Sequence, residues 1–434
     1  MLSIAARQCA RRIECSTNIY SYFARHSYLV PSNSQVFLPG LLQKNPASLQ
    51  KVNGVIRQNS KIALHFSTKT NPKSQKIVGS WLLTCSGLVF VAVVLGGVTR
   101  LTESGLSMVT WKLLGEKIPT TENGWVEEFE RYKIFPEYKI NNTDITLEEF
   151  KHIWWMEYAH RMWGRLIGFA FIIPAAYFWS KGMLQPVMKI RVLALGSLLG
   201  MQGLMGWYMV KSGLEDRFHG PSDIPRVSQY RLASHLGLAF LMYTGLLYNA
   251  LDHLLPAKTH AVDYFGSKNV QLSIIKSLRR FKMMVYGTKG LVFITALSGA
   301  FVAGMDAGLI YNTFPKMADK WIPDDILALY PLLRNFTENP TTVQFDHRIL
   351  GITTLALVTC ITMMSRKHNL PGRGSLAVKV AFCAGYFQVI LGISTLVYHV
   401  PLALAVMHQS GSLVLLSSMI WLCHELKYFK KIAK

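Results

Sequence analysis

Acidic residues are scarce in this chain of 434 residues. It has 24 aspartates and glutamates against 46 lysines and arginines, which gives a formal net charge of +22. Such an excess can indicate nucleic-acid binding. Here, however, the basic residues lie in the amino-terminal arm and in alternate loops, without a basic module interleaved with aromatic residues. The charge pattern therefore argues against a nucleic-acid partner.

The sequence signatures of many soluble enzymes are also missing. The chain has no P-loop, no GxGxxG dinucleotide fingerprint and no evident Ser-His-Asp arrangement. Its six cysteines include no CxxC motif, and four of them fall within apolar stretches, where thiols usually act as small core residues. We therefore expect neither a structural disulfide nor a zinc site.

Long hydrophobic runs, by contrast, are abundant. Half of the residues are hydrophobic, and several apolar runs are long enough to cross a hydrocarbon layer about 30 Å thick. We expect an all-α membrane protein with eight transmembrane helices at about 77–99, 162–180, 192–210, 231–251, 284–305, 348–364, 376–398 and 402–423.

The second half of this region repeats the first. The segment from Gly96 to Leu106 resembles the segment from Gly299 to Leu309, and Gln202 to Gly206 resembles Gln388 to Gly392. Self-similarity of this kind indicates a duplicated structural unit. It predicts two pseudo-symmetric four-helix bundles.

Charge also predicts the orientation and the domain limits. Connections after the even-numbered helices are basic and those after the odd-numbered helices are more acidic, so the positive-inside rule places both termini in the mitochondrial matrix. The arm before residue 76 is basic and has Glu14 as its single acid, which is typical of a mitochondrial transit peptide. The expected domains are a transit peptide or disordered basic arm (1–75), a first bundle (76–251), a matrix connector (252–282), a second bundle (283–425) and a basic matrix tail (426–434).

Four histidines occupy matching places in the two repeats. They are His160, His235, His347 and His408. Each lies near the amino end of an even-numbered helix, so all four are expected at one membrane depth, towards the intermembrane space. Each bundle contributes two of them from facing helices, which is the geometry that a six-coordinate heme iron requires. The sequence thus predicts two bis-histidine sites; for any single histidine the alternative is a hydrogen-bonded structural residue.

Neighbouring residues favour a planar heme over a bare metal ion. Gly164 and Gly351 each follow a histidine by one helical turn, which would let a porphyrin approach the helix. Arg161, Arg165 and Arg348 could pair with heme propionates. Arg100 is either a further propionate anchor or an interfacial residue that extends to the surface. His399, at the same side of the membrane, is the rival of His408 as a ligand.

Only the first repeat has a carboxylate beside its first histidine. Glu157 lies three residues before His160, on the same helix face, where the second repeat has Gln344. A carboxylate can act as a base or stabilise a developing cation, whereas a glutamine can do neither. We infer a catalytic first half and an electron-transfer or structural second half. The alternative is a capping or surface glutamate paired with Arg161.

These features together resemble the mitochondrial heme A synthases, inner-membrane enzymes that convert heme O to heme A. The resemblance covers about residues 77–425 and rests on the segments Gly96 to Ser107, Glu157 to Arg165 and Phe345 to Gly351. Unlike bacterial relatives that carry a cysteine pair in the first outer loop, residues 101–156 contain no cysteine. A thiol-based step therefore cannot be carried over.

The resemblance implies a stepwise oxidation of the C8 methyl of heme O, through an alcohol and a geminal diol, to the formyl group of heme A for cytochrome c oxidase assembly. It implies that His347 and His408 hold a permanent heme B, near Arg348 and Gly351. It also implies a substrate heme flanked by His160 and His235, with Glu157 essential nearby. The partners we expect are a ferredoxin and ferredoxin reductase system, heme O synthase and further copies of the chain.

Two other classes stay open on the sequence alone. A heme-binding electron carrier would need two bis-histidine sites but no carboxylate in one half only. A transporter could also be built from duplicated bundles. Against a transporter, these repeats run parallel and their polar groups gather at one face.

Overall fold

The protein is described by a computed structural model that covers residues 71–215, 227–255, 272–368, 370 and 372–427. Most of the predicted transit peptide, part of the predicted connector (256–271) and most of the basic tail (428–434) lie outside the described residues. Eight long helices form the described part: α3 (Pro72–Leu101), α6 (Leu147–Ser180), α7 (Pro186–Gly213), α8 (Gln229–Leu254), α10 (Leu272–Gly304), α12 (Pro340–Ser365), α13 (Gly372–Val397) and α14 (Leu402–Lys427).

Seven of these long helices combine the length and the hydropathy of a membrane span within the described ranges. The chain is therefore a multi-pass α-helical membrane protein. The one remaining predicted span, 231–251, coincides with α8, which is long enough but is not among the seven. Its histidine, tyrosine and asparagine residues lower its hydropathy. Such residues are tolerated here because α8 packs against four other long helices and not chiefly against lipid.

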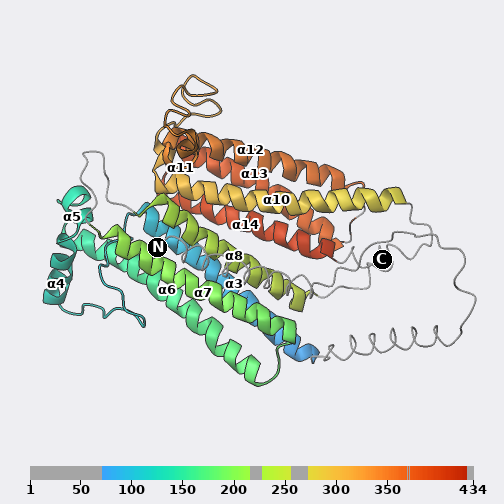
Figure 1. Ribbon diagram of the computed structural model, residues 1–434, viewed down its shortest axis with the longest axis horizontal. Helices are drawn as coiled ribbons and strands as arrows, with labels where there is room; N and C mark the ends of the chain where they lie inside the picture. Colours follow the sequence, from blue (N-terminus) through green and yellow to red (C-terminus); the bar gives the residue numbers. More distant parts are fainter. Residues whose placement is uncertain (1–70, 216–226, 256–271, 369, 371, 428–434) are drawn as a thin grey trace, which may run out of the picture. The chain divides into compact units, whose positions relative to one another are not determined.

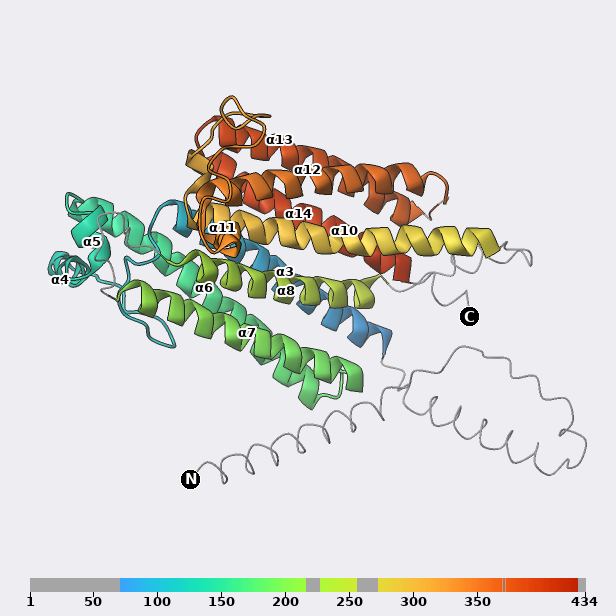
Figure 2. The ribbon, with the colours of Figure 1, turned by 45° about the horizontal axis from the view of Figure 1, so that its top comes forward.

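The long helices form two neighbouring sets (Figures 1 and 2). In the first set, α3 contacts α6 and α8, and α7 contacts α6 and α8. In the second set, α10 contacts α12 and α14, and α13 contacts α12 and α14. The sets meet where α3 and α8 pack against α10 and α14. One continuous apolar cluster joins residues of all eight helices.

Two helix starts differ most from the boundaries expected from hydropathy. Helix α6 begins at Leu147, well before position 162, because a capping box at Thr146 and Glu149 starts a polar, amphipathic extension of the apolar span. His160 therefore lies in the interior of a helix. Helix α10 begins at Leu272, inside the segment assigned to the connector, and buries Phe281 in the common core.

The loops that precede α6 and α12, called the outer loops after their expected orientation, carry short helices. The first loop contains α4 (Glu122–Lys133) and α5 (Pro136–Asn141). The second contains α11 (Asn335–Glu338) and the 3-10 turns η1 (Ala307–Leu309) and η2 (Leu332–Arg334). An aromatic cluster fixes α4 against the extension of α6; its buried members are Met108, Trp125, Phe129, Tyr132, Phe150 and Trp154.

Polar contacts also tie the two sets together. At the outer end, Arg100 Nη2 lies 2.8 Å from Asp306 Oδ1. Near the opposite end, Lys427 Nζ and His424 Nε2 lie 2.6 and 3.1 Å from Asp252 Oδ1. Because the side chains of His424 and Asp252 are largely buried, this cluster fixes the packing of α14 on α8 more firmly than an exposed pair would.

Candidate active site

Each of the four predicted histidines lies against a glycine of a neighbouring helix. The contacts are Gly96 with His160, Gly206 with His235, Gly299 with His347 and Gly392 with His408; a Cβ at these glycines would lie 3.0, 3.4, 3.2 and 2.8 Å from the histidine Cε1. Each glycine comes one to two turns before its helix ends at the outer loops. The four imidazoles therefore share one end of the helices, in positions that match between the repeats.

The two histidines of the second repeat face each other closely. The ring centroids of His347 and His408 are 6.2 Å apart and the ring planes are inclined by 89°. Two metal–nitrogen bonds of about 2 Å, added to the distance from each ring centre to its nitrogen, span about this separation. The spacing is therefore compatible with one iron between the rings.

A hydroxyl group sets the tautomer of His347. Ser298 Oγ lies 2.7 Å from His347 Nδ1 and donates its own proton to Thr295 O, also at 2.7 Å. Since that hydroxyl has one proton, it accepts at the imidazole, and Nδ1 carries the hydrogen. The lone pair of Nε2 is then available to a metal, which is the usual arrangement around a ligating histidine.

Two glutamines hold the other histidines at matching positions. Gln388 Nε2 lies 3.1 Å from His408 Nδ1 and donates to its backbone carbonyl at 2.8 Å. Gln202 Nε2 lies 3.3 Å from His235 Nε2. In the first repeat, His160 Nδ1 and His235 Nδ1 are buried without a hydrogen-bond partner. Buried nitrogens without a partner are expected beside a ligand site, because a bound heme would supply the missing contact.

Open space adjoins the helices one turn after two of these histidines. The buried members of the common core on α12 and α14, such as Val358 and Leu413, begin beyond the histidines towards the opposite end of the helices. A Cβ at Gly164 or Gly351 would meet no atom within 4 Å. The four histidines, the tautomer of His347 and this open space are compatible with a heme in each set.

Glu157 and Arg161 form a buried ion pair next to His160. Arg161 Nε donates to Glu157 Oε1 at 2.5 Å, and their side chains are only 2% and 5% exposed. The pairing with Arg161 considered as the alternative for Glu157 therefore occurs, but in the interior and not at the surface. A buried carboxylate compensated by one guanidinium stays available for proton chemistry, so the pairing and a catalytic role are not exclusive.

The arginines expected to bind propionates donate hydrogen bonds to the outer loops. Arg161 Nη2 donates to Met108 O at 2.8 Å, and Arg348 Nη2 donates to Tyr311 O at 2.9 Å, at matching positions of the repeats. Arg165 donates to carbonyls of the same first loop. Arg348 Nε is nevertheless buried without a partner, as is Nε of Arg100, whose Nη2 binds Asp306 across the two sets.

His399 lies apart from the facing rings. It is exposed, in the turn after α13, and has a positive φ of 61°. His408, not His399, lies opposite His347.

Comparison with known proteins decides which family this architecture represents. Residues 79–420 match the family profile of the COX15-CtaA cytochrome oxidase assembly proteins. Heme A synthase COX15 of Homo sapiens is 53% identical over 387 residues, which are 89% of this chain and 90% of the relative. Heme A synthase COX15 of Arabidopsis thaliana is 44% identical over 400 residues (91% and 85%). Heme A synthase of Nitrosospira multiformis is 46% identical over 354 residues (81% and 94%).

The chain belongs to the heme A synthase family. This confirms the resemblance that the histidine and glycine motifs indicated. The residues of this heme A synthase that sequence reasoning left without a role are those that hold the histidines: Gly206, Gly299, Gly392, Gln202, Gln388 and Ser298. All except Ser298 fall in the repeated segments, so their recurrence beside each histidine was the available signal.

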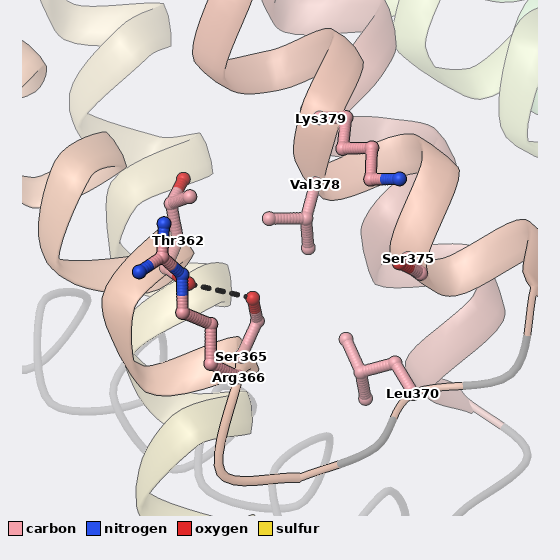
Figure 3. Close-up of a pocket in the computed structure, with 7 residues that line it drawn as sticks. All are labelled: Thr362, Ser365, Arg366, Leu370, Ser375, Val378 and Lys379. Atoms are coloured by element: carbon pink, nitrogen blue, oxygen red, sulfur yellow. Dashed lines mark hydrogen bonds between the residues drawn. The ribbon is translucent and has the colours of Figure 1, made fainter.

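No group of three or more metal-ligating side chains occurs among the residues that the structure describes. Two histidines suffice for a heme, whose porphyrin supplies the remaining ligands. A cavity of about 310 Å³ lies elsewhere, at the far ends of α12 and α13 (Figure 3). Ser365 in its wall lies 18 positions after His347, about 27 Å along the helix. This cavity is not part of the candidate site.

The contact between Gly392 and His408 gives a first prediction. A Cβ here would lie 2.8 Å from the ring, so Gly392→Ala forces His408 to move. We expect the purified protein to retain about tenfold less heme B, because displaced ligand orientation typically costs 10–100-fold in affinity. Heme per protein in the monodisperse fraction is the measurement. Gly203→Ala on α7, where a Cβ meets nothing within 4 Å, is the control; equal heme in both variants would contradict the packing argument.

Proposed function

We propose that this chain oxidises the C8 methyl of heme O, through an alcohol and a geminal diol, to the formyl group of heme A. The main supporting observation is that each of the four histidines contacts a glycine at a matching position of the two repeats. Only the first repeat adds a buried carboxylate, Glu157. Duplicated sites with a single asymmetric charge suit one reacting heme and one auxiliary heme. The names and the extent of the relatives support the same activity.

The proposed architecture is eight spans in two pseudo-symmetric four-helix bundles. It is supported by the matching contacts of α3, α6, α7 and α8 with those of α10, α12, α13 and α14. Helix α8 would cross the membrane among its neighbours, where its polar residues face protein.

The substrate heme O would lie in the first bundle between His160 and His235. Gly164, one turn after His160, leaves space for its macrocycle. Arg161, Arg165 and Arg100 would order the loop above it, and the unpartnered Nε of Arg100 could bind a propionate. Glu157 Oε1 is held by Arg161 beside the reacting edge and would take up the proton released there.

The permanent heme B would lie in the second bundle on His347 and His408, near Gly351, with Arg348 Nε facing a propionate. When bound, it supplies a redox-active iron that exchanges electrons with the first site. Ser298 and Gln388 orient its ligands. Gln344 bonds Ala307 O and Arg348, so the position matching Glu157 is structural in this half.

We further propose the mitochondrial inner membrane as the location, with both termini in the matrix and the histidines towards the intermembrane space. The basic residues at the ends of the long helices opposite the histidines support this orientation; they include Lys276, Arg279, Arg366 and Lys427. A ferredoxin system is the proposed electron partner there. Heme O synthase and further copies of the chain are the other proposed partners.

Extraction of the bound hemes tests the proposed activity directly. We expect the protein purified in mild detergent to yield heme B together with heme O, hydroxylated heme O or heme A, identified by chromatography and mass. Heme B alone would favour the electron-carrier alternative. Absence of any heme would return the transporter to consideration.

A further inference from the structure

Trp111, in the first outer loop, has no role in the function proposed so far. Its ring nevertheless reaches the histidines of the first repeat. A Cβ at Gly206 of α7 would lie 3.4 Å from Trp111 Cη2 and 3.4 Å from His235 Cε1. Gly206 lies about two turns before α7 ends at Gly213. The indole therefore extends from the loop to the level of His235.

Two arginines of α6 also contact the Trp111 ring. Arg161 Cζ lies 4.9 Å and Arg165 Cζ 5.7 Å from the ring centroid. Both distances are within the range of an attractive cation–π interaction. Its contacts with both helices place the indole between α6 and α7, which pack less closely on each other than their counterparts α12 and α13. Because Arg161 directly follows His160, Trp111 borders the surroundings of both histidines of the first repeat.

The backbone on both sides of Trp111 is fixed to α6. Arg161 donates to the carbonyl oxygens of Met108 and Thr110 at 2.8 and 2.7 Å. Arg165 donates to the carbonyls of the two residues that follow Trp111. None of these bonds involves the indole. Shortening the side chain at position 111 therefore leaves the loop attached to α6.

The second repeat has a different arrangement at the matching position. In the register of the repeat, Trp111 corresponds to Phe314. Phe314 is 38% exposed, and its ring makes no cation–π contact with any residue that the structure describes. At Gly392, the counterpart of Gly206, the three atoms nearest to an added Cβ all belong to His408. The indole therefore distinguishes the bundle proposed to hold the substrate heme from the bundle proposed to hold heme B.

We propose that Trp111 is a wall of the substrate-heme site and keeps the partly oxidised heme bound between the oxidation steps. The inference rests on the proposed function. Conversion through an alcohol requires the same heme to react more than once, so an intermediate that leaves early does not become heme A. A flat apolar ring beside His235 gives the macrocycle a contact surface that slows its release. A permanent heme needs no such wall, because it does not exchange.

The alternative is that Trp111 only fastens the loop to α6. Trp111→Phe separates the two roles, because a phenyl ring keeps an aromatic face for the two arginines but lacks the ring edge that reaches Gly206. Trp111→Ala removes both contacts. We expect W111F and W111A to retain heme B but to release heme O about 2- to 30-fold faster than the wild type, with W111A at the upper end. The measurement is the rate at which bound heme O passes to excess apomyoglobin, with no electron acceptor present.

The product ratio gives a second readout. During turnover, both variants should release more hydroxylated heme O relative to heme A than the wild type. The first oxidation of heme O that is already bound should keep its single-turnover rate, which a misaligned site would not do. Phe314→Ala, at the matching position of the second repeat, is the matched control and should keep the wild-type product ratio and the wild-type content of heme B.

The outcomes are distinct. Release of heme O and of the intermediate at wild-type rates in both variants would overturn the proposal and leave the proposed function intact. Faster release in W111A with wild-type release in W111F would show that the residue only fastens the loop. An equal shift in F314A would show a general effect of the loops and would also overturn the proposal. If W111A does not fold, W111F decides alone. A wild type that forms neither hydroxylated heme O nor heme A would instead refute the proposed function.

Discussion

His347→Ala and His408→Ala should each yield protein that has lost heme B and retains the first-bundle site. The two rings face each other at 6.2 Å, and Ser298 holds the tautomer that leaves His347 Nε2 free to ligate. Loss of an outer-shell partner alone costs about 10–100-fold in metal affinity, so loss of a ligand should cost more. The measurement is heme B per protein after acid extraction, with the low-spin heme spectrum of the intact protein.

Two further variants make this expectation sharp. Ser298→Ala removes the hydrogen bond to His347 but no ligand, so it should lose less heme B than either histidine variant. His399→Ala, at an exposed turn residue, should keep full heme B. The reverse pattern, with heme B lost in H399A and retained in H408A, would show that the rival ligand is the correct one.

Hydropathy predicted the long helices well because lipid contact selects apolar residues over a fixed length. Its signal is weaker where a helix does not face lipid, although the span predicted at 231–251 coincides with α8. The outer extension of α6 packs Trp154 into a loop cluster, and α8 packs among four helices, so neither carries a full hydrophobic signal. The start of α10 at Leu272 was also missed by hydropathy, because its first turns carry basic residues. They nevertheless bury Phe281 in the core.

For the site, the repeat selected the histidines but not the residues that would hold them. Recurrence in both halves selected His160, His235, His347 and His408, and the structure places all four beside glycines at one depth. The partners of the arginines could not be read in this way. Arg161 and Arg348 bind carbonyls of their own loops, which depends on loop conformation.

Glu137 shows a different limit. Nothing in its local sequence distinguishes it from the exposed glutamates of the same loop. It is buried where α5 packs on α4, with Tyr138 of α5 edge-to-face against Phe129 and Tyr132 of α4. Tertiary packing, and not the local sequence, determines its burial.

The contrast between Glu157 and Gln344 leads to the second large effect. In the second repeat, Gln344 Oε1 accepts from Arg348 at 3.3 Å, at the position where Glu157 binds Arg161. The protein itself therefore shows that glutamine is accommodated beside this arginine. Glu157→Gln should fold, retain heme B and bind the substrate heme, because the arginine also keeps its bonds to loop carbonyls.

What E157Q loses is the ability to take a proton or to stabilise developing positive charge at the substrate. We expect conversion of heme O to fall by about 10²- to 10⁴-fold, the usual contribution of a positioned acid–base group. Heme O should accumulate in the purified variant, and hydroxylated heme O and heme A should disappear from its extract. Chromatography of the extracted hemes with parallel single-turnover assays measures both.

Gln344→Glu is the informative counterpart, since it places a carboxylate at the matching position of the second half. It should not restore turnover to E157Q, because the heme proposed there is an electron carrier and not a substrate. Glu148→Gln, at an exposed glutamate in the first turn of α6, should behave as the wild type. If E157Q with normal heme content turned over at the wild-type rate, Glu157 would be a structural partner of Arg161, and catalysis would have to rest on the histidines.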